Sequence, residues 1–331
     1  MADEQSSLTQ HVRAFEAGAH VVAAAFVDDE PALALADGSL LIGAPDAGRR
    51  IVAHPDGAVL VATSEGNRLI TGGDDGRVVA TSAAGETIEI ANEKGRWIDA
   101  VTTRGEVIAW SAGKQARARD AAGAVKSWSA PSTVRGLCLL PKGYRLALAH
   151  YNGVSLWFPN VAAEPILLEW KGSHLDATCS PDGRFLVTSM QENALHGWRL
   201  ADSRNMRMTG YPGKTRSVSW SAEGHWLATS GADACVVWPF RDKDGPMGKA
   251  ARECGVRAAR VTQVAFHPRA LVVAIGYADG LVLLCRLGDG AEILVRAPGE
   301  GAISAFAWDS TGARLLFGLE SGLVGLLTLP A

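Results

Sequence analysis

The chain has 331 residues, of which 47% are hydrophobic and 20% charged, so it can bury a large core and is not of the disordered class. Its net charge of -3 argues against a nucleic-acid partner, because nucleic-acid-binding proteins are more often basic. No apolar run is long enough for a membrane helix, and residues 1–10 (MADEQSSLTQ) lack the features of a signal peptide, so we expect a cytoplasmic protein without membrane contact.

Short strand patterns separated by turns recur along the whole chain. Glycines mark the first turn of most repeats, and the gaps between successive ones run from 38 to 41 residues. An apolar run and a second turn follow, with Asp-Gly or Asn-Gly at Asp37, Asp75, Asn152 and Asp279. These dipeptides tolerate the positive φ angles of tight hairpins, so each repeat is predicted to be antiparallel. Four strands in about 40 residues are typical of a β-propeller blade.

The repeats predict a single, all-β, closed propeller with eight four-stranded antiparallel blades. The N-terminal segment 11–18 resembles a fourth strand, and we expect it to complete the last blade and remove two open sheet edges. Residues 1–8 are expected to be flexible. The alternative is a ring of seven blades, with the polar third unit around Gly113–Asp120 distorted. The predicted blades span residues 19–56, 57–95, 96–132, 133–172, 173–213, 214–258, 259–300 and 301–331.

The repeats resemble those of the WD40-repeat family in degenerate form. The fifth unit carries Gly172-Ser173-His174 before its first strand, Ser180-Pro181-Asp182-Gly183 at its turn and Trp198 at the end of its third strand. The second and seventh units have Thr81 and Cys285 where the family has tryptophan. In this family a His, a Ser or Thr, an Asp and a Trp form a buried hydrogen-bonded set. The resemblance assigns these structural positions to His174, Ser189, Trp198, Ser230, Asp233, Trp238, Trp157, Asp75 and Asp279, with His20 as a further candidate histidine.

The resemblance also implies a non-catalytic scaffold that binds a protein or peptide across one face. We find no catalytic motif, and we expect no cofactor, no metal and no enzymatic activity. The eight histidines are scattered and form no metal-ligand motif. The five cysteines are widely spaced without a CxxC pair, so we interpret the cysteines as small buried hydrophobic residues. The alternative is a propeller enzyme, or a protein with a small-molecule or metal site in its channel. Its candidate residues on the first strands are Asp99, His174, Asp176 and Gln263.

Basic residues recur in the segments that join one predicted blade to the next. Such segments share one face of a propeller, so their cations would surround one mouth of the channel and favour an acidic or phosphorylated segment of a partner. The competing interpretation is ordinary charge on surface loops, with Trp97 beginning a buried strand. The long loop Pro239–Arg260 is either a docking element or an inert insertion. The candidate partner-binding residues are Arg96, Trp97, Arg135, Lys171, Lys214, Arg216, Arg257, Arg260 and Tyr211.

Overall fold

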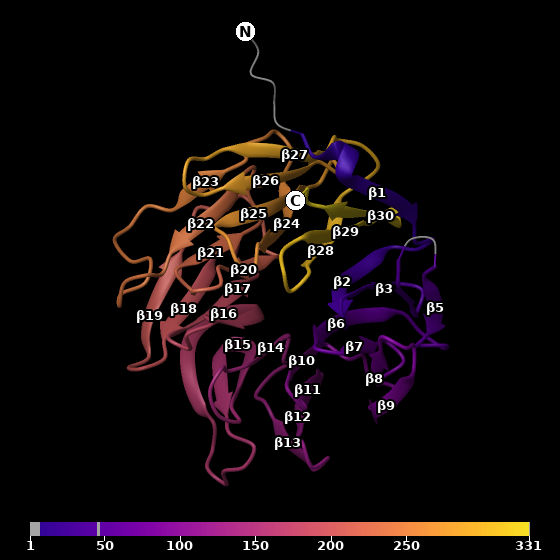
Figure 1. The fold of residues 1–331 in the computed structure, drawn as a ribbon. Coiled ribbons are helices and arrows are strands. Elements are labelled where there is room, and N and C mark those ends of the chain that lie inside the picture. Colours follow the sequence, from indigo (N-terminus) through magenta and orange to yellow (C-terminus); the bar gives the residue numbers. More distant parts are fainter. Residues whose placement is uncertain (1–6, 45–46, 331) are drawn as a thin grey trace.

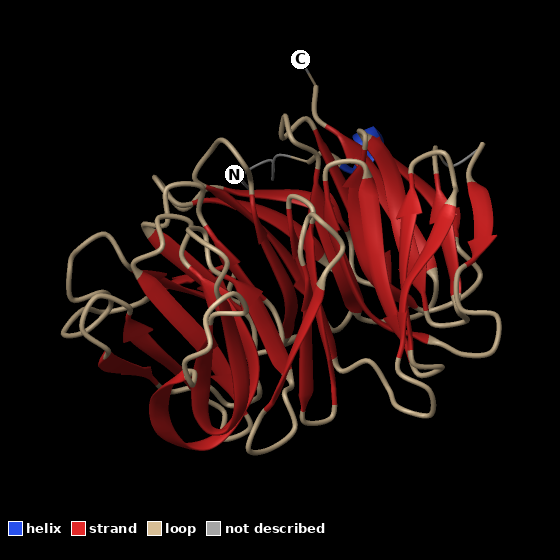
Figure 2. Ribbon diagram, turned by 90° about the horizontal axis from the view of Figure 1, so that it is seen from below, coloured by secondary structure: helices blue, strands red, loops and turns tan. Residues whose placement is uncertain are grey.

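The computed structural model describes residues 7–44 and 47–330, and β-strands of these residues form a closed ring of sheets around a central axis (Figure 1). Viewed from the side, the strands of neighbouring sheets run across the thickness of the disc and loops cover its two faces (Figure 2). Three sheets follow in chain order, each with its inner strand first. They are β2 (Val21–Val27), β3 (Glu30–Leu35), β4 (Ser39–Ile42) and β5 (Arg49–Val52); β6 (Val59–Glu65), β7 (Arg68–Gly73), β8 (Arg77–Ser82) and β9 (Thr87–Asn92); and β10 (Ala100–Arg104), β11 (Val107–Ala112), β12 (Gln115–Arg119) and β13 (Val125–Ser129).

The fourth sheet has six strands and contains both the fourth and the fifth repeat. Its strands are β14 (Gly136–Leu139), β15 (Leu146–Trp157), β16 (Ile166–Cys179), β17 (Phe185–Met190), β18 (Leu195–Arg199) and β19 (Arg204–Met208). Three four-stranded sheets complete the ring. They are β20 (Val218–Trp220), β21 (Trp226–Thr229), β22 (Cys235–Pro239) and β23 (Arg252–Cys254); β24 (Val261–Phe266), β25 (Val272–Tyr277), β26 (Val282–Arg286) and β27 (Glu292–Arg296); and β28 (Ile303–Trp308), β29 (Arg314–Leu319), β30 (Leu323–Thr328) and β1 (Val12–Glu16).

Counted as hydrogen-bonded sheets, the ring has seven blades, so the expectation of eight is wrong and the alternative of seven holds. The physical reason lies in β15 and β16, which continue past the expected turns instead of ending there. Residues 146–149 of β15 pair with β14, whereas residues 153–156 pair with β16. Likewise, residues 166–169 of β16 pair with β15 and residues 174–179 pair with β17. Each repeat therefore keeps four strand segments, but the two repeats share one sheet. The third unit, expected to be the distorted one, is a regular sheet.

The N-terminal strand closes the ring as the sequence predicts. All five residues of β1 pair antiparallel with β30, and the Ala17 N–H donates to the Gly322 carbonyl at 2.8 Å. A 3₁₀ helix, η1 (Thr9–His11), precedes β1, and the Leu8 N–H donates to the Leu294 carbonyl at 2.7 Å. Residue 8 is therefore hydrogen-bonded to the neighbouring sheet, residues 1–6 lie outside the described part of the chain, and the flexibility expected for residues 1–8 stays a prediction.

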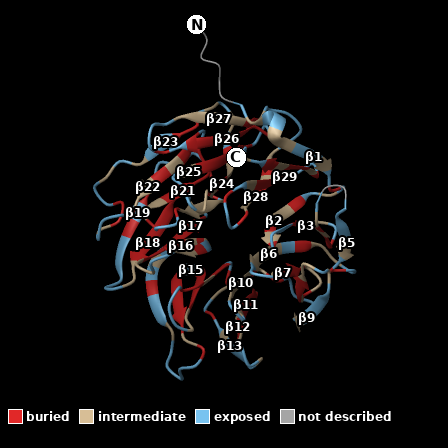
Figure 3. Cartoon of the chain, in the orientation of Figure 1, coloured by how far each residue is buried: buried red, intermediate tan, exposed pale blue. Residues whose placement is uncertain are grey.

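The hydrophobic core lies between successive sheets, where the buried middle strands of each sheet face the next sheet (Figure 3). The strands β7, β17 and β29 are almost wholly buried, which explains why their sequences are continuous apolar runs rather than alternating ones. The outer strands β5, β9 and β13 are largely exposed and more polar. This packing holds the inner strands rigidly around the channel.

Candidate partner-binding site

A buried histidine network in the second repeat fixes a loop at one face of the ring. His54 Nδ1 lies 3.0 Å from Asp75 Oδ1, and His54 Nε2 lies 2.9 Å from Thr71 Oγ1. The structural position predicted for Asp75 is therefore occupied as expected. His54 was missed by the sequence analysis, although its place just before the first strand of a repeat was a usable signal. Thr81, in the place of tryptophan, is buried, and its hydroxyl has no hydrogen-bond partner in residues 7–44 and 47–330.

The fifth repeat uses a neighbouring residue in place of the predicted serine. His174 Nδ1 lies 2.7 Å from the Thr188 hydroxyl, and its Nε2 lies 3.0 Å from the Trp170 carbonyl. Ser189 instead lines the central channel, because adjacent residues of a strand point to opposite faces. His174 and Trp198 are both buried and their ring centroids lie 5.6 Å apart, as expected for two positions of one network.

In the sixth repeat a tyrosine takes the place of the histidine. The Trp238 indole N–H donates to the Tyr211 hydroxyl at 2.6 Å, and that hydroxyl lies 2.7 Å from Thr229 Oγ1. Tyr211 is buried, so the expectation that it anchors a partner at the surface is wrong. Its hydroxyl gives it a structural role that the sequence pattern did not reveal.

The other predicted structural positions differ in burial and in hydrogen bonding. Ser230 is not in the Tyr211 network; its Oγ accepts from the backbone N–H groups of Arg216 and Ser217 at 3.2 and 3.0 Å. Asp233 is exposed. Trp157 is buried in the core between the third and fourth repeats, and Asp279 accepts from the Leu281 N–H at 3.1 Å within its turn. His20 is exposed and lines a cavity.

Three of the predicted cations meet at one wide cavity, here called the mouth cavity, with a volume of about 830 Å³. Lys214, Arg216 and Arg260 line it, and within the described residues none of the three forms an ion pair. Glu320 is the carboxylate in its wall. The remaining lining residues are His20, Asn193, Gly213, Ser230, Val261, Thr262, Gln263, Ala278, Ala302, Ile303 and Ser304.

The mouth cavity shares Arg216 with a second cavity of about 420 Å³, which lies among the inner strands and is here called the central channel. Its wall is largely apolar, with side chains such as Leu60, Leu137 and Leu175. Arg135 also lines the channel, where its guanidinium lies 2.8 Å from Asp99. This ion pair neutralises one of the cations that the sequence places at the mouth.

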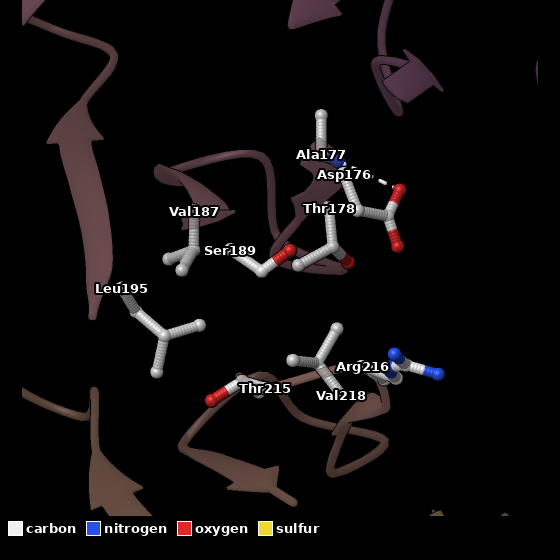
Figure 4. Close-up of a pocket in the computed structure, with 9 residues that line it drawn as sticks. All are labelled: Asp176, Ala177, Thr178, Val187, Ser189, Leu195, Thr215, Arg216 and Val218. Atoms are coloured by element: carbon white, nitrogen blue, oxygen red, sulfur yellow. Dashed lines mark hydrogen bonds between the residues drawn. The ribbon is translucent and has the colours of Figure 1, made fainter. Parts of the chain in front are cut away.

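Asp176 is the second carboxylate of the central channel. Its side chain is open to the channel, but the surrounding walls limit its hydration, and this desolvation raises its pKa to about 6. Asp176 and Arg216 also flank a cavity of about 10 Å³, the size of one water molecule (Figure 4). Thr215 lines that cavity, and its buried hydroxyl has no hydrogen-bond partner within the part of the chain that the structure describes. Figure 4 shows the Asp176 and Arg216 side chains extending to the same side of the cavity.

The other predicted cations do not join this group. Arg257 forms an ion pair with Glu292 at 2.5 Å. Lys171 is exposed and lines neither the mouth cavity nor the central channel. Arg96 and Trp97 line a separate cavity of about 610 Å³. In the long loop, Lys249 is paired with Asp242, so part of the basic charge of Pro239–Arg260 is used within the protein. The predicted cationic ring is therefore a local cluster and not a continuous ring.

The described residues contain neither a metal-binding cluster nor a membrane-spanning helix. Among residues 7–44 and 47–330, no three or more His, Cys, Asp and Glu side chains are grouped so that they could hold a metal ion. No helix in the same ranges has the length and apolar character needed to cross a membrane.

Comparison with known proteins supports the fold. The family described as "WD domain, G-beta repeat" (WD40) matches residues 204–238, which span β19 to β22. The computationally designed Ika8 protein, known from a crystal structure, is 16% identical; the match covers 95% of this chain and 98% of that one, with a TM-score of 0.78. At that identity the likeness concerns the fold alone, and 1731 solved chains match, so the fold selects no particular function. The sequence matches none of the curated proteins with which it was compared.

Proposed function

Because this chain is a WD40-repeat β-propeller, we propose that it is a non-catalytic scaffold that binds an acidic or phosphorylated segment of a partner protein at the mouth cavity. The observation that carries the proposal is the convergence of Lys214, Arg216 and Arg260 on one cavity without carboxylate partners among the described residues. WD40 propellers commonly serve as protein-interaction scaffolds, and this cluster supplies a specific chemistry for one.

The backbone around the mouth cavity supports a preorganised site. Ser230 accepts the N–H groups of Arg216 and Ser217, so the start of the inner strand is held in place before a ligand arrives. The Arg260 guanidinium lies beside Gly213, where a Cβ would come within 2.9 Å of Nη1. Glycine at this position therefore leaves room for Arg260 to reach the cavity. Guanidinium groups bind carboxylate and phosphate oxygens in bidentate geometry, which gives both strength and direction.

The proposal is tested with two double variants of equal charge change. Arg216→Glu/Arg260→Glu alters the mouth cavity, whereas Lys126→Glu/Lys142→Glu alters exposed cations elsewhere on the surface. Binding of fluorescein-labelled peptides rich in Asp, Glu or phosphoserine is measured by anisotropy at a fixed salt concentration. We expect the mouth variant to weaken binding by about 100-fold and the control by about threefold or less, since charged hydrogen bonds contribute about 1.5–3 kcal/mol each. Equal loss in both variants would show that only net charge matters.

A small ligand of the central channel is the second candidate function. The observation in its favour is a cavity of about 420 Å³ that holds Asp176 and Arg216 within otherwise apolar walls, an arrangement typical of ligand pockets. Thermal-shift screening of small molecules against the wild type and Leu60→Trp, which would fill the channel, tests it. Ligand-induced shifts that are absent from the filled variant would support this candidate over the scaffold.

A further inference from the structure

Trp97 presents an aromatic side chain to solvent from a rigid loop. The indole is 65% exposed, which is unusual for a tryptophan, whereas the next residue, Ile98, is fully buried. Hydrogen bonds fix the backbone on both sides: the Arg96 N–H donates to the Glu93 carbonyl and the Ile98 N–H donates to the Gly73 carbonyl, each at 3.0 Å. The inner strand β10 begins only at Ala100, so the alternative that Trp97 begins a buried strand is wrong. The loop thus holds the indole outward.

Trp97 lies in the wall of the cavity of about 610 Å³, together with two basic side chains, Arg96 and Lys114. We name this cavity the Trp97 cavity. Its other lining residues include the polar side chains of Gln115, Ser129 and Thr133.

The carboxylates near the Trp97 cavity are already engaged within the protein. Glu93 forms an ion pair with Arg117 and accepts from the Trp110 indole N–H at 2.9 Å, and these contacts lower the pKa of Glu93 even though desolvation alone would raise it. Asp99 accepts from Arg135 at 2.8 Å and from the Gly113 N–H at 2.7 Å. Neither Arg96 nor Lys114 forms an ion pair within the described ranges, although the charge of Arg96 also helps to lower the pKa of Glu93. The cavity therefore combines one exposed aromatic face with two cations that form no ion pair within the described ranges.

We propose that the Trp97 cavity is a second subsite for the same partner segment, and that it takes an aromatic or long aliphatic side chain flanked by acidic residues. This inference rests on the proposed scaffold function. A large apolar side chain packed on the indole would remove water from its own surface and from the indole face that it covers. The acidic neighbours of that side chain would reach Arg96 and Lys114. Tryptophan and arginine are the residue types that most often dominate binding energy at such interfaces.

The two subsites are separate cavities that each share a wall residue with the central channel. Asp99 lines both the Trp97 cavity and the central channel, and Arg216 lines both the channel and the mouth cavity. One extended segment lying across the channel can therefore contact both ends. A single-stranded nucleic acid would stack successive bases on several aromatics. Trp97 is the one aromatic side chain among the lining residues of the Trp97 cavity, so a protein segment fits better.

The test is selection from a displayed library of random 12-residue peptides on four proteins: the wild type, Trp97→Ala, Arg216→Glu/Arg260→Glu, and Tyr151→Ala. Tyr151 is the matched control, because its ring is 53% exposed and lines neither cavity. From the wild type and the control we expect peptides with acidic residues and one aromatic or leucine-type residue. From Trp97→Ala we expect acidic peptides without the apolar preference, and the wild-type peptides should bind that variant about 30-fold more weakly.

Two outcomes would overturn the inference. One is the same apolar preference in Trp97→Ala as in the wild type, and the other is Trp97-dependent binding of the oligonucleotide dT12 that is tighter than binding of the selected peptides. Failure of the scaffold proposal looks different: the Arg216→Glu/Arg260→Glu protein would then select the same acidic peptides as the wild type. Because Trp97 lies outside the core, we expect the Trp97→Ala protein to melt at the wild-type temperature, which shows that any loss of binding is local.

Discussion

The Tyr211 hydroxyl is the centre of a directional chain of hydrogen bonds in the sixth repeat. The Trp238 N–H can only donate, and it donates to Tyr211 at 2.6 Å. Thr229 donates to the Val236 carbonyl at 2.8 Å, so the Tyr211 hydroxyl must donate to Thr229 Oγ1 at 2.7 Å. This chain of hydrogen bonds connects the loop before β20 with the second and third strands of the same sheet. Tyr211→Phe removes two of its three bonds and keeps the aromatic packing.

The expected loss of stability can be worked from these contacts. Each hydrogen bond contributes about 1 kcal/mol net, and a buried donor left without a partner adds about 1 kcal/mol, so Tyr211→Phe should cost about 2–3 kcal/mol. Unfolding entropies of about 2.1 cal/mol/K per residue then give a fall in melting temperature of about 3–4 °C for this chain. Thermal unfolding followed by circular dichroism measures it.

Two variants make the test specific to the network. Tyr144→Phe is the matched control, because the Tyr144 hydroxyl is buried and none of the described residues hydrogen-bonds to it. Its loss should change stability by less than about 0.5 kcal/mol. Thr229→Val removes the next member, and the double variant with Tyr211→Phe should lose about 1 kcal/mol less than the sum of the single variants. Strict additivity, or equal effects of the Tyr211 and Tyr144 changes, would refute the reasoning.

The same residue predicts a pH dependence. Burial raises the pKa of Tyr211 above its ordinary value of 10.0, so the neutral phenol is favoured in the folded protein. Its contribution to stability is therefore complete below about pH 10 and is lost as the pH rises through the folded pKa. Tyr211→Phe should lose less stability than the wild type above pH 10.

Two further predictions concern buried positions. His196 is fully buried, its ring is stacked on Trp170 at 4.0 Å, and neither ring nitrogen has a hydrogen-bond partner among the described residues. His196→Phe should therefore leave stability equal or raise it by about 1 kcal/mol. Burial lowers the pKa of His196 to about 3, so the wild type should lose stability as the pH falls from about 6.5 to 3. The His196→Phe variant should lose less stability over this pH range. Thermal melts in which the variant is more acid-sensitive than the wild type would contradict this. Gly136→Ala should destabilise the protein by about 3 kcal/mol or more, because the new Cβ would lie 2.5 Å from the Asp176 Cα in the neighbouring inner strand. Denaturant unfolding measures the loss. A free energy of unfolding within about 0.5 kcal/mol of the wild-type value would show that the inner strands can separate.

The sequence alone determined the all-β ring, the repeat and its closure. These features depend on local chemistry: glycine and Asp-Gly pairs select tight turns, apolar runs between them select buried strands, and the segment before the first repeat carries the strand that the last repeat lacks.

The tertiary structure decided how neighbouring repeats join and which side chains meet. The Asn152-Gly153 and Gly172 segments have turn-forming glycines, yet β15 and β16 continue through them, and Tyr151 pairs with Ser173 across a shift of register. The participation of Thr188 in place of Ser189, and of Tyr211 in place of a histidine, depends on register and on space between strands, which the repeat pattern does not specify. The tertiary structure also decides which charged side chains are paired. Arg135 and Arg216 look alike in the sequence, but one lies beside Asp99 and is neutralised, whereas the other opens into the mouth cavity, because only the closed ring sets the distances between loops that lie far apart along the chain.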